Sequence, residues 1–313
     1  PDFAAGAMEN WGLITYRETA LLVDPENSSV ITRQNVAAII AHEMAHMWFG
    51  NLVTMHWWND LWLNESFASW MGDKAINDIF PAWDVWTNFV IDDTNIALEL
   101  DGLANSHPIE QEVNNPAEIG QLFDAISYSK GASILRMLEA FLSPTIFQKG
   151  IESYMKSHKY SNAQTTDLWN ALEIISKKPV HEIMKDWTSQ TGYPLIDIKL
   201  LSDTPNSIKL SIEQTPFRYD AIMKNNITLK QPLWNIPLTI DNYNSPKITA
   251  QLVSSKKTTI TLAKNQNQKA YWFKINPQQT GFYRVNYDTS QISMQKNIIT
   301  NKLIPPVDRL GIQ

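Results

Sequence analysis

The stretch AIIAHEMAHMWFGN, residues 38–51, contains two histidines four positions apart and a glutamate directly after the first. From about Gln34 to Phe49, apolar residues and strong helix formers dominate, and Gly50 followed by Asn51 provides a stop. The sequence therefore predicts a helix over this stretch. Its histidines raise the question of a metal site.

His42 and His46 have the spacing of two metal ligands on one helix. Residues i and i+4 lie on the same face about 6 Å apart, so both imidazoles can bind one ion. Glu43 lies one residue round, where its carboxylate can reach a metal-bound water without ligating the metal. This is the H-E-x-x-H arrangement of zinc peptidases, in which the metal lowers the pKa of the water and the glutamate removes its proton. The alternative is a chance match on a core helix, which we expect on the order of once in a hundred random chains of this length.

A catalytic zinc needs a third protein ligand and an open fourth position. Glu65 offers a donor 19 residues after His46, within WLNESFASW at 62–70 and on a second predicted helix from about Asp60 to Ile76. A loop between the two helices would bring Glu65 back to the histidine pair. We therefore predict one zinc ion per chain, bound by His42, His46 and Glu65.

The composition is that of a globular protein with an ample core, since 43% of the residues are hydrophobic and 19% are charged. The 313 residues fit two domains, or two and part of a third. A net charge of -6 without any block of lysine and arginine argues against a nucleic-acid partner. No apolar run approaches the roughly 20 residues of a membrane span. The absence of cysteine excludes disulfides and favours a reducing compartment.

Further elements follow the zinc motif. The stretch SKGASILRMLEAFL, residues 129–142, predicts a third helix with Pro144 beyond its end, and more helices are predicted through 145–190. After Pro194 the residues alternate and are rich in β-branched and aromatic types, which predicts short strands and a β-sandwich. The predicted strand segments are 195–202, 207–214, 233–240, 247–254, 257–263 and 271–287.

Four motifs stand out along the chain: GAMEN at 6–10, HEMAHMWFGNLVT at 42–54, WLNES at 62–66 and SYSKGAS at 127–133. Together they resemble the aminopeptidase N family of gluzincin metallopeptidases. Longer stretches are similar to its puromycin-sensitive aminopeptidase branch, which also resembles the archaeal tricorn-interacting factors. These stretches are PDFAAGAMENWG at 1–12, TYRETALL at 15–22, DAISYSKGASILRML at 124–138 and PPVDRLGIQ at 305–313.

The resemblance implies an α+β multidomain fold. Residues 1–194 would form a thermolysin-like, mainly helical zinc peptidase domain whose N-terminal part is missing. Residues 195–288 would form an antiparallel β-sandwich domain, and residues 289–313 the start of a C-terminal helical domain.

The resemblance also implies a zinc-dependent aminopeptidase that hydrolyses N-terminal residues from peptides with a free N-terminus, through a zinc-bound water activated by Glu43. Recognition of an α-ammonium requires a carboxylate fixed beside the metal. By resemblance that residue is Glu9, and Glu65 would share the ammonium. The neighbouring substrate-binding residues, on an edge strand, would be Gly6, Ala7, Met8 and Asn10. Tyr128 matches the tyrosine that stabilises the transition state, and Glu43 would pass its proton to the leaving amine.

Two other interpretations stay open. An epoxide-hydrolase-type relative would share overlapping motifs, and a catalytically silent peptide-binding fragment would keep the fold. Without the resemblance, Glu9 would be an exposed glutamate and Tyr128 a core or capping residue. Many relatives carry a glutamate that supports a zinc histidine where this chain has Gly72, so Asp73 is the candidate substitute.

The remaining histidines lack ligand spacing and are expected at the surface or in satisfied contacts; they are His56, His107, His158 and His181. The tryptophans at 57, 58, 62 and 70 are expected in the core or along a cleft wall. The branch implies peptide substrates in the cytoplasm, which agrees with the absence of cysteine.

Overall fold

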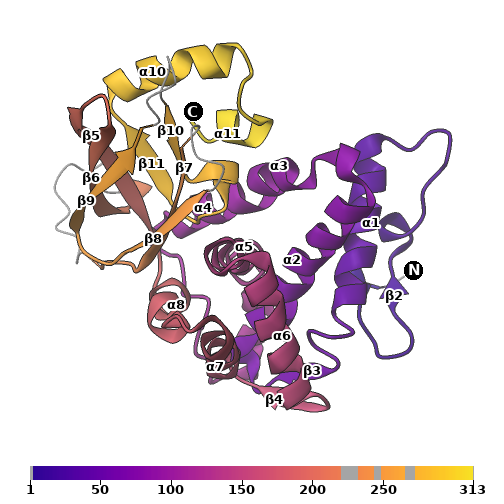
Figure 1. Ribbon diagram of the computed structural model, residues 1–313. Coiled ribbons are helices and arrows are strands. Elements are labelled where there is room, and N and C mark those ends of the chain that lie inside the picture. The colour runs from indigo at the N-terminus through magenta and orange to yellow at the C-terminus, as the bar shows by residue number, and fades with distance from the viewer. Residues whose placement is uncertain (1–2, 220–231, 243–247, 265–271, 313) are drawn as a thin grey trace. The chain divides into compact units, whose positions relative to one another are not determined.

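The computed structural model describes residues 3–219, 232–242, 248–264 and 272–312. Helices dominate up to about residue 190, and strands dominate beyond it (Figure 1). This mixture of helices and largely separate sheets is compatible with the predicted α+β class. Within the described ranges, no helix combines the length and apolarity that crossing a bilayer requires.

The helical part of the chain opens with a short hairpin. Its helices and strands are, in order, β1 Ala7–Met8, β2 Thr15–Tyr16, α1 Val30–Ala45, β3 Val53–Met55, α2 Trp62–Ile79, α3 Val85–Phe89, α4 Asn95–Asp101, α5 Gly131–Leu142, α6 Pro144–His158, β4 Ser161–Ala163, α7 Thr165–Ser176 and α8 Val180–Thr188. Two π-helical turns interrupt them, η4 Val90–Thr94 and η6 Ile126–Lys130. Short 3-10 turns lie at Glu18–Ala20, Trp58–Asp60, Pro81–Trp83 and Pro116–Leu122.

The strand-rich part contains every strand segment predicted from the sequence. Its elements are β5 Tyr193–Asp203, β6 Ser207–Phe217, β7 Ile236–Asn242, β8 Thr249–Val253, β9 Lys257–Ala263, β10 Phe273–Ile275, the turn Pro277–Gln279, β11 Arg284–Tyr287, α10 Thr289–Thr300 and α11 Pro306–Leu310. The predictions at Lys247 and Tyr271 lie outside the described residues.

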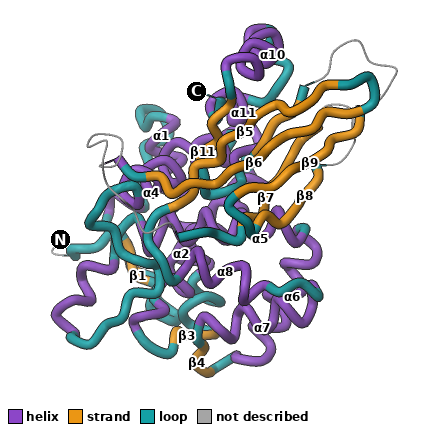
Figure 2. The backbone as a smooth tube through the Cα atoms, turned by 90° about the vertical axis from the view of Figure 1, so that its left-hand side faces the viewer, coloured by secondary structure: helices purple, strands orange, loops and turns teal. Residues whose placement is uncertain are grey.

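The strands of this part form two sheets, with the orders β11–β5–β6–β9 and β10–β7–β8. Figure 2 shows β5, β6 and β9 side by side. Neighbouring strands are antiparallel except for β11, which runs parallel to β5 with Val285 opposite Ile196. The predicted antiparallel arrangement is therefore wrong for this pair. Strands that are far apart in the sequence have a long connection between them, which permits parallel pairing.

Helix α1 begins earlier and ends earlier than the sequence pattern predicted. The Ser29 side chain accepts a hydrogen bond from the Thr32 backbone N–H at 3.1 Å, which caps the first turn. At the other end, the His46 N–H still donates to the His42 carbonyl at 3.1 Å. Gly50 then adopts a φ of +131°, which suits glycine and ends the helical path. The i to i+4 hydrogen bond between His42 and His46 therefore keeps both residues in the same helical geometry.

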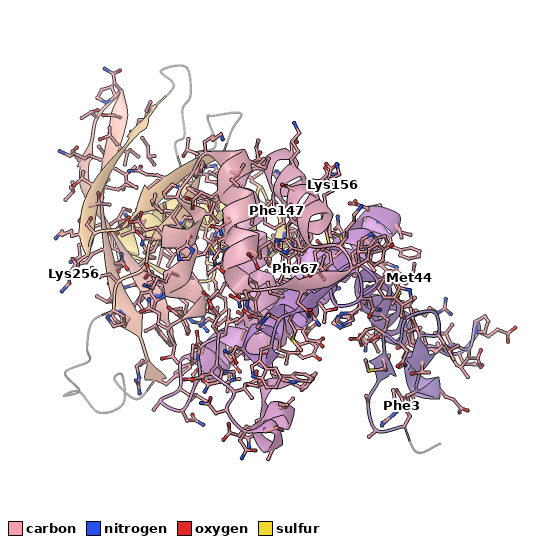
Figure 3. The ribbon with its side chains drawn as sticks, turned by 90° about the horizontal axis from the view of Figure 1, so that it is seen from below. Phe3, Met44, Phe67, Phe147, Lys156 and Lys256 are labelled. Atoms are coloured by element: carbon pink, nitrogen blue, oxygen red, sulfur yellow. The ribbon has the colours of Figure 1, made fainter. Side chains whose placement is uncertain are left out.

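Aromatic side chains fix α2 in the helical core. Trp62 and Phe67 are fully buried, and Phe67 stacks on Phe49 with ring centroids 4.4 Å apart. The Trp62 indole donates to the Thr165 hydroxyl at 2.8 Å. In Figure 3, Phe67 and Phe147 lie inside the helical part, where both are buried. This packing holds the helix that carries Glu65.

The described contacts divide the chain into two compact units. The first comprises residues 1–97 and 108–181 and contains α1, α2 and α5, whereas the second comprises residues 98–107 and 182–313 and contains the two larger sheets. The domain boundaries expected near residues 194 and 288 stay predictions.

Candidate active site

Helices α1 and α2 pack against each other and bring the three predicted metal ligands together (Figure 1). Glu65 Oε2 lies 3.3 Å from His42 Nε2 and 3.4 Å from His46 Nε2. The two Nε2 atoms are 3.0 Å apart. Among the residues that the structure describes, this is the only group of three or more such side chains close enough to hold a metal ion.

The donor geometry fits zinc. A tetrahedral zinc ion with ligand bonds of about 2.0–2.2 Å holds its ligand atoms about 3.3–3.6 Å apart, and the three separations here are 3.0, 3.3 and 3.4 Å. Burial would lower the pKa of His46, but the hydrogen bond and charge of Glu65 raise it to about 9. The cluster therefore attracts positive charge, which a divalent cation supplies. Two imidazoles and one carboxylate are also a donor set that leaves a fourth position open.

Neighbouring groups orient both imidazoles. His46 Nδ1 lies 2.8 Å from the Phe49 carbonyl oxygen, so Nδ1 donates and Nε2 presents its lone pair to the cluster. His42 Nδ1 lies 3.3 Å from the Ser69 hydroxyl. Sequence reasoning did not assign Ser69, although its position one helical turn after Glu65 was a usable signal.

Gly72, which stands where many relatives carry a glutamate, is explained by the packing of α2 against α1. A Cβ atom at this position would lie 3.0 Å from the His42 backbone nitrogen and 3.2 Å from the Ala41 carbonyl carbon. Glycine thus permits α2 to approach α1 where His42 stands. Asp73 forms no hydrogen bond to His42 or His46 within the described structure, so the contact to the His42 ring comes from Ser69.

Glu43 is buried beside the cluster and incompletely satisfied. Its side chain is 6% exposed, and within the described structure Oε2 has no hydrogen-bond partner. Burial raises the pKa of Glu43 to about 7 against the opposing charge of His46, with further contributions from Glu9 and Glu65. A buried carboxylate oxygen without a partner is costly unless a ligand or water completes it. The site is therefore built to receive a polar group at this oxygen.

The GAMEN segment forms the predicted strand. In β1, Ala7 pairs with Tyr16 and Met8 with Thr15, in antiparallel register. Within the described residues, β1 has no strand on its other edge. The Asn51 side chain donates to the Glu9 carbonyl at 2.7 Å and so ties this segment to the turn after α1. Sequence reasoning treated Asn51 only as a helix stop.

The other predicted substrate-binding residues lie along the same hairpin. The charge of Glu9 contributes to the raised pKa of Glu43. Asn10 donates to the Thr15 hydroxyl at 3.2 Å, and the Met8 side chain is 40% exposed. Asn10 therefore supports the hairpin, whereas Met8 faces solvent.

Tyr128 lies against the metal cluster. Its ring stacks on His42, with centroids 5.9 Å apart and an interplanar angle of 13°. The Asp124 carboxylate accepts backbone hydrogen bonds from Ile126 and Ser127 at 2.9 and 3.2 Å, which fixes the π-helical turn that carries Tyr128. Burial, together with the charge of Glu65, raises the pKa of Tyr128 above its ordinary value. The phenol therefore keeps its proton and can donate a hydrogen bond.

A cavity of about 390 Å³ connects these groups. Its lining includes Gly6 and Ala7 of the hairpin, the His42 and Glu43 side chains, and Tyr128. Of the predicted substrate-binding residues, Met8, Glu9 and Asn10 are not part of this lining. The cavity thus opens from the metal cluster toward the N-terminal end of β1.

The histidines without ligand spacing lie outside the cluster, as expected; they are His56, His107, His158 and His181. Trp62 and Trp70 are buried in the core, in agreement with the prediction. Trp57 is 47% exposed and donates to the Val113 carbonyl at 3.0 Å.

A helix pair that offers two imidazoles and a carboxylate to one cation, in the H-E-x-x-H order, is the arrangement of zinc metallopeptidases. The chain belongs to the peptidase M1 family, because the family model described as "Peptidase family M1 domain" matches residues 1–187. The family expected from the sequence motifs is therefore confirmed.

Curated relatives match along the whole chain. It is 45% identical to Aminopeptidase M1 of Arabidopsis thaliana over 323 residues, a match that covers 100% of this chain and 35% of that protein. It is 42% identical to Leucyl aminopeptidase of Saccharolobus solfataricus and to Puromycin-sensitive aminopeptidase of Caenorhabditis elegans, covering 100% of this chain and 37% and 32% of those proteins. The chain thus spans about a third of the length of these relatives.

Proposed function

We propose that this protein is a zinc-dependent aminopeptidase that releases N-terminal residues from peptides. The observation that carries the proposal is the convergence of the His42, His46 and Glu65 donor atoms beside the unpartnered oxygen of Glu43. Membership of the peptidase M1 family and the aminopeptidase names of its relatives support the same activity.

The proposed mechanism assigns separate tasks to the residues of the cavity. A zinc ion held by the two histidines and Glu65 would supply Lewis-acid activation of the attacking water and of the peptide carbonyl. Glu43 accepts a proton from the water and returns it to the leaving amine, acting as base and then as acid. Tyr128 donates a hydrogen bond to the oxygen on which negative charge develops.

Substrate binding is assigned to β1 and Glu9. An extended peptide can add through main-chain hydrogen bonds to the edge of β1 that no described strand covers, with Gly6 and Ala7 beside the cavity. The Glu9 and Glu65 carboxylates would hold the α-ammonium, which limits cleavage to the first peptide bond. A blocked N-terminus would leave these carboxylates without a cationic partner.

The alternatives from the sequence are less well supported. A catalytically silent peptide-binding protein has no physical need for Glu43 and Tyr128 beside a metal cluster. An epoxide-hydrolase-type activity finds no counterpart in the names of the relatives described above. The finer architecture, a thermolysin-like domain followed by a β-sandwich, and the cytoplasmic location belong to the same proposal.

Metal analysis combined with turnover of leucyl and alanyl anilides tests the proposed function. We expect one zinc per chain, cleavage of both anilides, and no cleavage of N-acetyl-leucyl anilide. Glu43→Gln should retain zinc and lower kcat by about 10²–10⁴-fold, the usual contribution of general acid–base catalysis. Tyr128→Phe should also retain zinc and lower kcat by about 10²–10³-fold, because one hydrogen-bond donor to the developing charge is lost.

The matched control is Glu118→Gln, which makes the same change at an exposed glutamate outside the cavity. This variant should behave as the parent protein does. A folded chain that binds no zinc, or a Glu43→Gln variant with parental turnover, would contradict the proposed function.

A further inference from the structure

A second cavity adjoins the one described above. It has a volume of about 370 Å³ and shares three wall residues, Ala38, Asp73 and Asp93, with the first cavity. All the residues that line either cavity belong to the first compact unit. A group that enters the first cavity can therefore extend past these two carboxylates into the second.

The lining of both cavities is acidic. Its carboxylates are Glu43, Asp73, Asp92 and Asp93, and neither lining contains a lysine or an arginine. Ser129 donates to Asp93 Oδ1 at 2.7 Å, which fixes one of the two shared carboxylates. Burial, followed by the charge of Asp93, raises the pKa of Asp73 to about 8, against the opposing charge of Arg136. A cationic side chain placed beside Asp73 would lower this pKa and favour the charged carboxylate. Arg136 is buried against the Trp86 and Phe89 rings and lines neither cavity.

The remaining walls suit a long side chain with a charged end. Ile31, Ile76 and Phe89 provide apolar surface, and Trp83 offers an indole that stacks on Phe80 with centroids 4.2 Å apart. Lysine and arginine side chains combine an aliphatic stem with a cationic end. The stem could pack on the apolar walls, and the cationic end could pair with the carboxylates or lie on the Trp83 ring. An inorganic cation is a poorer fit, since Asp73 and Asp93 belong to no metal-holding group of three in the described structure.

The position of the cavities relative to β1 identifies which substrate residue reaches them. In the proposed function, the α-ammonium lies at Glu9, which is not part of either lining. Ala5, Gly6 and Ala7 do line the first cavity. A peptide anchored at Glu9 and lying along β1 therefore runs toward Ala5, with its second residue beside the cavity. The unpartnered Oε2 of Glu43 lies in the lining of the first cavity, so this cavity holds a buried polar atom that a ligand can complete.

We propose that the two joined cavities form a subsite for a lysine or arginine at the second position of the peptide, with Asp73 and Asp93 as its specificity-determining residues. This inference rests on the proposed function, because the direction of the peptide follows from the binding of its α-ammonium. It assigns a preference among peptides by the residue that follows the cleaved bond.

Binding of three dipeptide amides to the zinc-loaded chain tests the subsite. The ligands are leucyl-arginine, leucyl-norleucine and leucyl-glutamate amides, measured by calorimetry in a Glu43→Gln background so that they stay intact. We expect the arginine peptide to bind roughly 5- to 10-fold more tightly than the norleucine peptide, as for a partly exposed charge pair. The glutamate peptide should bind most weakly.

Variants of the two shared carboxylates test whether the preference for arginine arises at this subsite. Asp73→Asn and Asp93→Asn, each made separately, should reduce the preference for arginine over norleucine to less than about 2-fold. Asp73→Lys should favour the glutamate peptide. The matched control is Asp78→Asn, which removes the same charge from an exposed position on α2 outside both cavities and should keep the preference.

The outcomes separate this inference from the proposed function. Equal affinity for the arginine and norleucine peptides would overturn the subsite, even if the parent protein cleaves both. A preference for arginine that depends on Asp73 would uphold the subsite, even if the parent protein cleaves none of the peptides. If none of the three peptides binds, the subsite is overturned, whereas zinc content and anilide turnover still decide the proposed function.

Discussion

Asn51 shows how a residue outside the metal cluster can position the substrate. Its side chain donates to the Glu9 carbonyl at 2.7 Å, while its own N–H donates to the His46 carbonyl at 3.0 Å. The residue thus links the end of the histidine helix to the strand that is assigned to the peptide. Asn51 is a positioning residue in this account, because it acts through Glu9.

Asn51→Ala should raise KM for leucyl anilide and leave zinc content unchanged. One neutral hydrogen bond contributes about 0.5–1.5 kcal/mol, which corresponds to roughly a 2- to 13-fold change in KM. We expect kcat to change less than KM, since the hydrogen bonds of Asn51 within the described structure go to Glu9, Met47 and His46 and not to Glu43 or Tyr128. Steady-state kinetics with parallel metal analysis would measure both.

Asn162→Ala is the matched control for this change. Asn162 also donates from its side chain to a backbone carbonyl in the first unit, that of Met55 at 3.1 Å, and within the described structure no side-chain hydrogen bond joins it to the hairpin. A parental KM in Asn51→Ala would show that Glu9 is held in place without this hydrogen bond. An equal rise in both variants would indicate a general loss of stability.

At the residue scale, the spacing of the motifs was enough to predict which side chains form the metal cluster. His42 and His46 lie together because an i, i+4 spacing places both on one helix face. Glu65 was expected from the motif spacing, and the packing of α2 on α1 brings it to the pair. Asp93 and the Asn51 contact were not predicted, since each depends on how separate elements pack. No local pattern in a sequence records such a distance.

At the scale of elements, the contact between α2 and α5 depends on Gly131. A Cβ atom at this position would lie 1.9 Å from the Ser66 hydroxyl and 2.8 Å from the Ser66 Cβ. The same hydroxyl donates to the Ser127 carbonyl at 2.6 Å, in the turn that carries Tyr128. The close approach of these helices therefore fixes both the core and the tyrosine.

Gly131→Ala should destabilise the protein by about 1–3 kcal/mol, because overpacking forces α2 and α5 apart. Thermal or denaturant unfolding would measure the loss of stability. Ser66→Gly alone should also cost stability, because it removes the buried hydrogen bond to Ser127. In the double variant the clashing side chain is gone, so the combined loss should be smaller than the sum of the two single losses. Gly120→Ala is the control, since no atom lies within 4 Å of a Cβ built there. Additive effects of the Gly131 and Ser66 changes would show that the two positions do not interact.

The failure to predict certain elements from the sequence has identifiable physical reasons. The helical stretch from α3 to α4 was not predicted, because the π-helical turn at Val90–Thr94 breaks the 3.6-residue period between them. Asp92 and Asp93 in this turn further weaken the helical signal. The strands were predicted well because alternation records burial on one face, but it does not specify which strands pair, as the parallel pairing of β11 with β5 shows.

At the scale of the whole molecule, the metal cluster and the larger sheets belong to different compact units. His42, His46 and Glu65 all lie in the first unit, whereas β5 and β6 lie in the second. A ligand stabilises the structure that forms its site, so bound zinc should protect the first unit. Free zinc at 100 times its Kd would contribute about 2.7 kcal/mol.

Removal of zinc by a chelator should therefore speed hydrogen exchange at backbone amides of α1 and α2 and leave β5 and β6 unchanged, as mass spectrometry of peptic fragments can measure. Glu65→Gln provides the control, because it removes one of three ligands and should make exchange in α1 insensitive to the chelator. Exchange in α1 that ignores the chelator in the parent protein would contradict a metal bound by the folded cluster. Equal acceleration in β5 and β6 would instead show that the two units unfold together, so that the metal at α1 and α2 stabilises the entire chain.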